Sequence, residues 1–454
     1  MDKKGLDLGK EPILSLLLKM SWPSIAAMLA MAVYNLIDTF WLTRYSPQAI
    51  AALTICFPIQ MIFGAIGIGT GVGAGSFAAR MFGARMDLKA RQSAGQIIIL
   101  SLLFGFLIII LTLCYTETIL SFFGATEDIL PLSRQYLVTV VFGSPFLLFL
   151  MMSNNLLRAE GKPNASMFVI LTMSAIGAVL DPILIFGWGP FPRMGILGAA
   201  ISAIIAYATA GSLSFYYLQL RTSKYDLKWQ YLIPNFPIIC AIYQTGFPSL
   251  IMNLVFGLVM IVYNHILGSF GPHAIATLGL CFRINGLIVM VMFGIGHGVM
   301  PIVGFSQGAG LYKRLMETVN VAVRLTAFFG TITFLLLEIF SDSILTLFTP
   351  DVSLLETAIP ALRIFVSMLL LIGPNLVWIN MFIGLGKGFT SMVLLMTRDA
   401  LFLIPMLLIL PSWYGLNGVW MAQPLSNLLA FFIILFWTKR EFHKISSLLK
   451  NSPS

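Results

Sequence analysis

Two aspartates lie deep inside long apolar stretches of this sequence, where a carboxyl group is unusual and costly. Asp38 lies within the stretch Tyr34–Trp41, and Asp181 stands directly before Pro182. Charged side chains within a membrane span usually mark an ion or substrate pathway. Apolar surroundings disfavour the charged form of a carboxyl group. Each aspartate is therefore suited to take up a proton at one membrane face and release it at the other, or to bind Na⁺ in competition with that proton.

Neighbouring residues add polar groups beside each aspartate. In a helix, Tyr34 and Asn35 precede Asp38 by four and three residues and share its face. Pro182 has no N–H, so the carbonyl of Ala178 loses its helical partner and is free for a cation or a water. We predict an ion-coupling site that consists of Asp38, Asp181, Asn35 and Tyr34. In the alternative reading, Asp38 bonds Asn35 or the backbone and only anchors its helix.

The elements that position these residues are predicted to be membrane-spanning helices. Hydrophobic residues make up 58% of the chain and charged residues 10%, whereas a soluble domain has about 25% charged residues. Apolar runs of about twenty residues, the length needed to cross a bilayer, occur twelve times. The sequence therefore predicts an all-α integral membrane protein with twelve transmembrane helices.

The two halves of the sequence repeat each other at an offset of 225 positions, which aligns Pro23 with Pro248. The offset also superimposes glycines 69, 71 and 73 on 294, 296 and 298. A duplicated apolar chain is typical of secondary transporters, in which two bundles rock about a site between them. The glycine runs lack the lysine of a phosphate-binding loop, so they indicate close helix packing. Asp38 aligns with Tyr263, and the acids are thus expected in one bundle only, as a functional rather than a structural feature.

Charge and polarity indicate the organisation of the chain. We expect a cytoplasmic leader at 1–12, a six-helix bundle at 13–220, a cytoplasmic linker at 221–237, a second bundle at 238–438 and a cytoplasmic tail at 439–454. The net charge of +9 comes from Lys and Arg concentrated in alternate loops, which is the positive-inside pattern. The basic surplus therefore indicates a multi-pass protein of the plasma (inner) membrane with both termini cytoplasmic, and not nucleic-acid binding.

Polar residues in other spans are weaker candidates. Asn154, Asn253, Tyr263 and Arg283 are predicted to contact substrate, although hydrogen bonding between helices is the commoner role of such residues. Arg283 is expected to be the only basic residue clearly within a span. Arg398-Asp399 is expected at a helix end as a structural ion pair. No His or Cys grouping has metal-ligand spacing, so we expect no metal or cofactor apart from the coupling ion.

Five segments, taken in order, resemble the MATE (multidrug and toxic compound extrusion) family over nearly the whole chain: 34–41, 83–85, 158–163, 180–187 and 194–200. The resemblance implies a V-shaped pair of bundles and efflux of organic cations driven by H⁺ or Na⁺. An acid in the first span and another before proline in the fifth resemble the DinF-like branch, which implies coupling at Asp38 and Asp181. Gly177 and Ala203 stand where the family often has Asn and Thr beside the cation, and this favours protons.

We therefore predict a multidrug efflux transporter that exchanges organic cations or amphipathic compounds for H⁺ or Na⁺ by alternating access. We expect small-molecule substrates, a surrounding lipid bilayer and a monomer. The alternative is a flippase or exporter for a lipid-linked or amphipathic metabolite, whose cavity would need several cationic side chains. An enzyme is not expected, because the chain has no H-E-x-x-H or Ser/His arrangement. A passive channel would conduct regardless of an opposing ion gradient.

Overall fold

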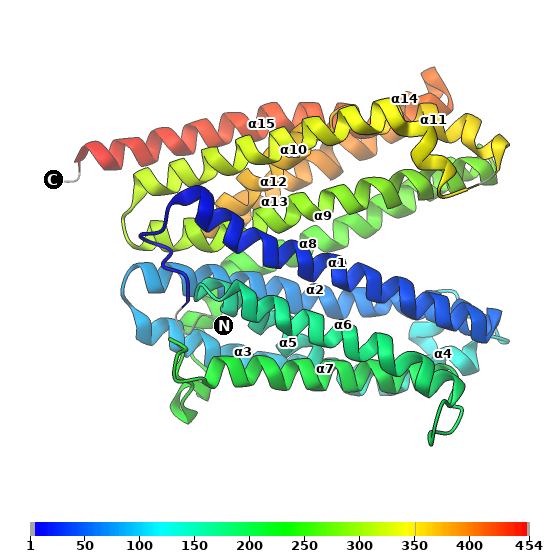
Figure 1. The fold of residues 1–454 in the computed structure, drawn as a ribbon, viewed down its shortest axis with the longest axis horizontal. Coiled ribbons are helices and arrows are strands. Elements are labelled where there is room, and N and C mark those ends of the chain that lie inside the picture. Colours follow the sequence, from blue (N-terminus) through cyan, green and yellow to red (C-terminus); the bar gives the residue numbers. More distant parts are fainter. Residues whose placement is uncertain (1–4, 350, 452–454) are drawn as a thin grey trace. The chain divides into compact units, whose positions relative to one another are not determined.

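The structure is a computed structural model that describes residues 5–349 and 351–451, except for the side chains of 253, 254, 256 and 449–451. All regular elements in these residues are helical (Figure 1). Eleven of the described helices are long and apolar enough to cross a membrane, and a pair bent by 46°, α11 (Val352–Val366) and α12 (Leu369–Gly384), makes a twelfth span. The prediction of an all-α protein with twelve spans is confirmed.

The helices of the first half recur in the second half in the same order. The first set is α1 (Ile13–Tyr45), α2 (Pro47–Gly83), α3 (Asp87–Phe122), α4 (Leu130–Val140), α5 (Ser144–Ala159), α6 (Pro163–Phe186) and α7 (Ile196–Gln219). The second set is α8 (Phe236–Gly268), α9 (Pro272–Gly308), α10 (Tyr312–Thr346), α11, α12, α13 (Gly388–Met396), α14 (Ile404–Tyr414) and α15 (Leu416–Asn451). The bounds of α2 and α9, and those of α5 and α12, differ by the same 225 positions as the sequence repeat. The duplication thus extends to the helix ends.

The chain forms two compact units, and each draws on both halves of the sequence. One unit contains Ala26–Leu250, and the other contains Leu8–Ile25 and the chain from Ile251 onward. Both α1 and α8 are therefore divided between the units near their internal prolines, Pro23 and Pro248. The boundaries of the units do not coincide with the expected bundle boundaries at 220 and 238.

Glycines allow the first parts of α1 and α8 to approach their neighbours closely. A Cβ at Gly73 of α2 would lie 2.2 Å from the carbonyl oxygen of Ile242 in α8. At the aligned Gly298 of α9, a Cβ would lie 2.6 Å from Oγ of Ser21 in α1. Small residues at such spacing allow helices to pack backbone against backbone. The glycine runs therefore serve helix packing, as predicted.

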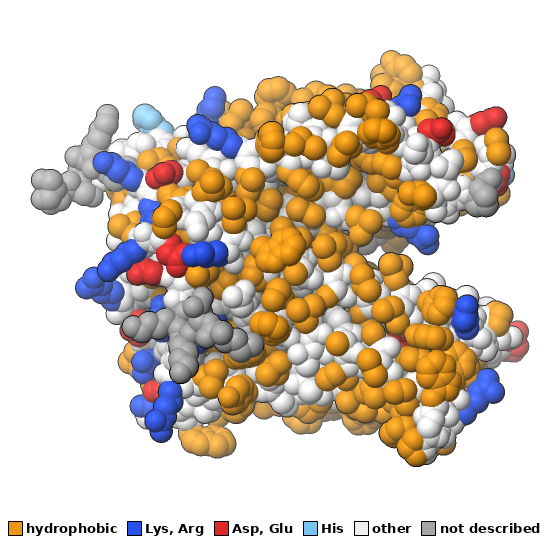
Figure 2. Space-filling view, in the orientation of Figure 1, with side chains coloured by type: hydrophobic (Ala, Val, Ile, Leu, Met, Phe, Trp, Pro, Cys, Tyr) orange, Lys and Arg blue, Asp and Glu red, His pale blue; other side chains and the backbone are white. Residues whose placement is uncertain are grey.

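Apolar side chains cover the outer flanks of the helices (Figure 2). On α3, Leu103 and Ile110 are more than half exposed, and so are Phe328 and Ile339 on α10. Soluble proteins rarely expose contiguous apolar faces of this kind. In a bilayer, however, these faces meet lipid chains and need no protein partner.

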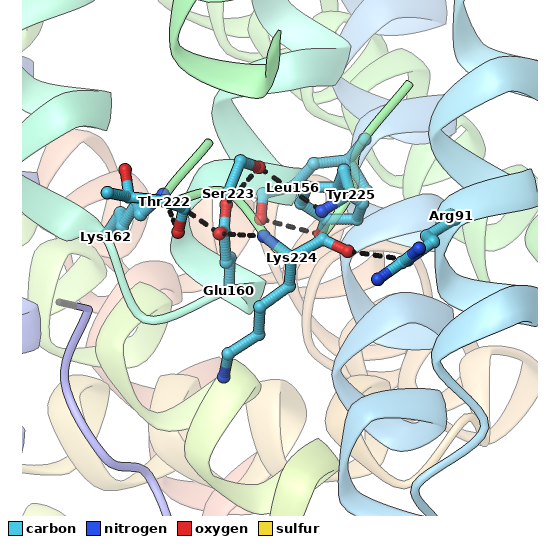
Figure 3. A network of polar contacts seen from close by, with 8 residues as sticks. All are labelled: Arg91, Leu156, Glu160, Lys162, Thr222, Ser223, Lys224 and Tyr225. Carbon is cyan, nitrogen blue, oxygen red and sulfur yellow. Dashed lines mark hydrogen bonds and ion pairs between the residues drawn. The ribbon is translucent and has the colours of Figure 1, made fainter. Parts of the chain in front are cut away.

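The polar segment between α7 and α8 is fixed to the first unit by a buried carboxylate (Figure 3). Glu160, only 1% exposed, accepts hydrogen bonds from Ser223 Oγ (3.1 Å) and Lys224 N (2.6 Å). Lys162 Nζ lies 3.0 Å from the same carboxylate. The Tyr225 hydroxyl donates to the Leu156 carbonyl at 2.8 Å. Burial, and then the charge of Glu160, hold the pKa of Tyr225 well above its usual range, so that the phenol keeps its proton.

The same segment also lies along α3. Gln96 Nε2 donates to the carbonyls of Tyr231 (3.0 Å) and Ile233 (2.9 Å), and its Oε1 accepts from Asn235 N (2.9 Å). Arg91 Nε donates to the carbonyl of Lys224 at 2.9 Å. The connection is therefore a structured strap on the first unit.

Candidate functional site

Asp181 lies inside α6 and is completely buried. Its exposed fraction is 0%, and neither carboxyl oxygen has a hydrogen-bond partner of regular geometry among the described residues. The Ser202 hydroxyl lies close enough to interact with the carboxyl but donates to the Gly177 carbonyl instead. A buried polar group without a partner is rare in folded proteins, because its lost hydration is not replaced. The unpaired carboxyl is therefore suited to bind something that is absent from the protein itself, such as a proton or a cation.

Close packing of α1 and α6 surrounds this carboxyl. A Cβ at Gly177, one turn before Asp181, would lie 2.4 Å from the Tyr34 ring. Gly177 thus provides the space in which the buried Tyr34 side chain reaches α6. Ser202 Oγ of α7 donates to the Gly177 carbonyl at 3.3 Å. The Tyr34 ring therefore occupies the space beside Gly177, the position at which the resemblance led us to expect Asn.

Asp38 belongs to the same cluster of ionisable side chains. It is half-buried and interacts electrostatically with Asp181, Tyr34, Tyr136 and Tyr207. Elements far apart in the sequence, α1, α4, α6 and α7, bring these five residues together. The predicted grouping of Asp38, Asp181 and Tyr34 thus corresponds to one place in the first unit, named here the acid–tyrosine cluster.

Two members of the cluster were not foreseen from the sequence. Tyr136 accepts a hydrogen bond from Gln60 Nε2 at 3.2 Å, and Tyr207 packs beside Gly143. Neither has an acidic neighbour at helical spacing that would distinguish it from other tyrosines in apolar runs. Asn35, by contrast, is exposed, and the described residues contain no hydrogen bond between it and Asp38.

An apolar hollow lies beside the cluster. Its volume is about 420 Å³, and it is lined by Val33, Leu36, Ile37, Phe40, Trp41 and Ala178. Trp41 contacts Phe186 and Trp188 with ring centroids 5.8 and 5.7 Å apart. Ile37 and Ala178 adjoin Asp38 and Gly177 in sequence. An amphipathic molecule in the hollow would therefore have its apolar body near the carboxyl groups.

The candidates for substrate contact lie in different surroundings. Tyr263 is fully buried and donates to Gln423 Oε1 at 3.3 Å, whereas Arg283 is exposed. Asn154 is held within the protein: its amide donates to the Ser166 carbonyl at 2.9 Å, and its Oδ1 accepts from Arg158 and from Ser166 Oγ. This geometry gives no support to a substrate role for Asn154. The side chain of Asn253 lies outside the described residues.

Arg398 and Asp399 do not lie at a helix end, and that expectation is wrong. They belong to a π-helical segment, Thr397–Leu403, near the middle of the span Gly388–Tyr414. The expected ion pair is present, with Nε–Oδ1 and Nη2–Oδ2 distances of 2.8 and 2.9 Å. Arg283 is thus not the only basic residue within a span, and buried acids are not confined to the first bundle. Helical periodicity did not reveal this arrangement, because a π-helix interrupts the α-helical spacing.

A duplicated set of transmembrane helices with carboxyl groups inside it defines a multi-pass membrane protein of the secondary-transporter class. The profile of the MatE family matches residues 23–183 and again residues 248–409. Because the two matches together cover more than half of the sequence, the chain belongs to the MatE family. Members of this multidrug efflux family are transporters, in agreement with the expectation that the chain is not an enzyme.

Similar proteins cover almost the entire chain. An FAD transporter of Shewanella oneidensis is 27% identical over 423 residues, which is 92% of each chain. Multidrug export protein MepA of Staphylococcus haemolyticus is 26% identical over 427 residues, which is 93% of each chain.

Solved structures agree with the fold. An outward-facing multidrug resistance MATE family transporter has a TM-score of 0.90 at 25% identity, over 97% of this chain and 98% of that one. A transporter from Pyrococcus furiosus, described as having a binding pocket of reverse polarity, also has a TM-score of 0.90 at 25% identity, over 98% of this chain and 99% of that one.

Proposed function

We propose that this protein is a multidrug exporter that exchanges organic cations or amphipathic compounds for H⁺, with the acid–tyrosine cluster as its coupling site. The observation that carries the proposal is Asp181, a fully buried carboxyl without a hydrogen-bond partner among the described residues. A buried carboxyl of this kind is stabilised when a proton or a cation occupies it. Its occupancy can therefore be linked to the conformation of the protein.

The coupling would follow from differential binding. An ion that binds the cluster more tightly in one conformation shifts the equilibrium toward that conformation. With Asp38 and Asp181 in electrostatic contact, a cation or a proton at one carboxyl alters the charge felt by the other. A cationic substrate beside Asp38 would compete with the coupling ion for the same negative charge. This competition is the basis of exchange.

Several finer features belong to the same proposal. The acids in α1 and α6 support a place in the DinF-like branch. Gly177, filled by the Tyr34 ring, removes an amide from the surroundings of Asp181 and supports H⁺ over Na⁺ as the coupling ion. The positive-inside pattern supports a plasma (inner) membrane protein with both termini cytoplasmic. We further propose a monomer and alternating access.

The test is uptake of a fluorescent organic cation, ethidium, by inside-out proteoliposomes with a pH gradient or a Na⁺ gradient imposed. Wild-type protein should accumulate ethidium with the pH gradient, and Asp38→Asn should not. Asp128→Asn, which changes an exposed acid between α3 and α4, is the matched control and should behave as wild type. Uptake without dependence on either gradient would contradict the proposal and favour a passive channel.

A second candidate is an exporter of an amphipathic metabolite. It is favoured by the similarity to an FAD transporter and by the second basic residue within a span, Arg398. In this case FAD should be transported by the same vesicles, and ethidium should not. Uptake of FAD by the inside-out vesicles, measured by flavin fluorescence, distinguishes the two functions.

A further inference from the structure

A buried ion pair interrupts one span of the second unit and has no role in the coupling site described above. The Arg398 side chain is 17% exposed and that of Asp399 is 6% exposed. Charged groups near the middle of a bilayer span are functional candidates by default, since a purely structural role rarely justifies their cost. π-helical segments within α-helices are likewise frequent at functional sites.

The geometry of the pair leaves one edge of the guanidinium unused. Asp399 accepts from Nε and Nη2, so both of its oxygens face the same side of the Arg398 group. An arginine has five N–H donors in a fixed fork. Three of them, on Nη1 and Nη2, have no hydrogen-bond partner among the described residues. Asp399 thus orients the guanidinium and leaves a second pair of donors available.

The neighbours of the pair are polar but provide no further acid for that edge. Tyr263 interacts electrostatically with both Arg398 and Asp399. Its hydroxyl donates to Gln423 Oε1 of α15, and α15 packs along the π-helical segment. The Gln423 amide nitrogen has no hydrogen-bond partner in the described part of the chain and is a further donor. The surroundings therefore contain donors for an anion.

We propose that Arg398, oriented by Asp399, forms a binding site for the carboxylate or phosphate group of an amphipathic anion. The free edge matches the two oxygens of such a group, and bidentate pairing of this type is the preferred mode of arginine. The bound anion would satisfy two of the three guanidinium N–H groups that Asp399 leaves free. The inference deepens the proposed export function by adding anionic and zwitterionic compounds to its substrates, and it rests on that function only for the transport step.

Three probes with one apolar body test the charge preference: 1-naphthyl phosphate, 1-naphthoate and 1-naphthylmethylammonium. Binding to detergent-solubilised protein is measured by equilibrium dialysis without an ion gradient, so a failure of coupling cannot be mistaken for a failure of binding. Wild-type protein should bind one or both anions. Phosphate and carboxylate as separate probes identify which group is preferred.

The informative variant is the double substitution Arg398→Gln/Asp399→Asn. It replaces the ion pair with neutral amides of similar shape, and neutral replacements of buried pairs are usually tolerated. Anion affinity should fall by about tenfold or more, as expected from the loss of a charge-assisted bidentate contact, and binding of the ammonium probe should not change. Arg134→Gln, which removes an exposed cation of the first unit, should bind all three probes like wild type.

A further variant separates the two residues. Asp399→Asn keeps the guanidinium and one acceptor oxygen to orient it, but removes the negative charge that opposes an anion, so anion affinity should rise several-fold. Equal anion binding by wild type and the double variant would overturn the proposal. The same conclusion would follow if Asp399→Asn bound anions less tightly while retaining the elution profile of the folded protein.

Discussion

Two spans from corresponding parts of the repeat each contain a buried acid, but in opposite environments. One span is α6, and the other consists of α13, the π-helical segment and α14. In α6, Asp181 is fully buried and unpaired among the described residues. In the other span, Asp399 has both oxygens bound to Arg398. A duplicated scaffold can thus hold one carboxyl ready for an external ion and neutralise another with a cation of its own. Position in the repeat does not determine the role of the acid.

The largest effect is expected at the unpaired acid. Asp181→Asn should reduce gradient-driven ethidium uptake to below about one tenth of wild type, because the amide cannot exchange a proton at this position. The variant should still elute as folded protein, since Asn fills the same space. Asp399→Asn should not abolish the pH-gradient dependence. If it did, both acids would belong to coupling and the contrast between the spans would disappear.

The paired acid should matter more for folding. Arg398→Gln alone leaves Asp399 buried without a counter-charge, which typically costs about 3–5 kcal/mol. The thermal unfolding midpoint should fall well below that of the double variant Arg398→Gln/Asp399→Asn, in which both charges are absent. A single variant as stable as the double variant would indicate that the pair is not an interacting unit.

Alanine substitutions at the aligned glycines 73 and 298 should destabilise the protein by different amounts, although the two positions are equivalent in the sequence repeat. In Gly73→Ala the new methyl group meets the rigid carbonyl of Ile242, whereas in Gly298→Ala it meets the rotatable Ser21 hydroxyl. Overpacking typically costs about 1–3 kcal/mol, so the first substitution should be near the upper end and the second near the lower. Thermal unfolding of the two purified variants measures the difference. Equal midpoints would indicate that both helix pairs relax alike.

The smallest of these effects is expected in the strap between α7 and α8. Glu160→Gln weakens bonds to Ser223, Lys224 and Lys162, and loss of charge-assisted hydrogen bonds typically costs about 1–3 kcal/mol. Asp226→Asn is the control, because Asp226 is exposed and its ion pairs within the described residues are the long ones with Arg91 (3.5 Å) and Lys228 (3.7 Å). Limited proteolysis should cut the strap faster in Glu160→Gln only. Equal cutting rates would show that Glu160 does not hold it.

Features that depend on residues close together in the sequence, or on the repeat, could be predicted from the sequence. The twelve spans follow from apolar length, and the repeat follows from the 225-residue offset. The cluster of Asp38, Tyr34 and Asp181 could be proposed because carboxyl groups are conspicuous in apolar runs. Tyr136 and Tyr207 could not, because only the packing of α4 and α7 brings them to the acids. The position of Arg398 is not predictable, because a π-helical segment has no recognisable sequence spacing. The sequence predicts the strap only as a linker, because its bonds to Glu160 and Gln96 join residues that are distant in the sequence.

The division of α1 and α8 between the two compact units has a consequence for the chain as a whole. Each unit is completed by an arm contributed by the other half of the sequence: Leu8–Ile25 for one, and the part of α8 before Leu250 for the other. Neither half is therefore a self-sufficient folding domain, although each contains one complete copy of the repeat. The arrangement is that of an arm-exchanged dimer whose two subunits are joined into one polypeptide. Halves produced separately should be unstable alone and should associate when produced together, and two stable, non-associating halves would disprove this view.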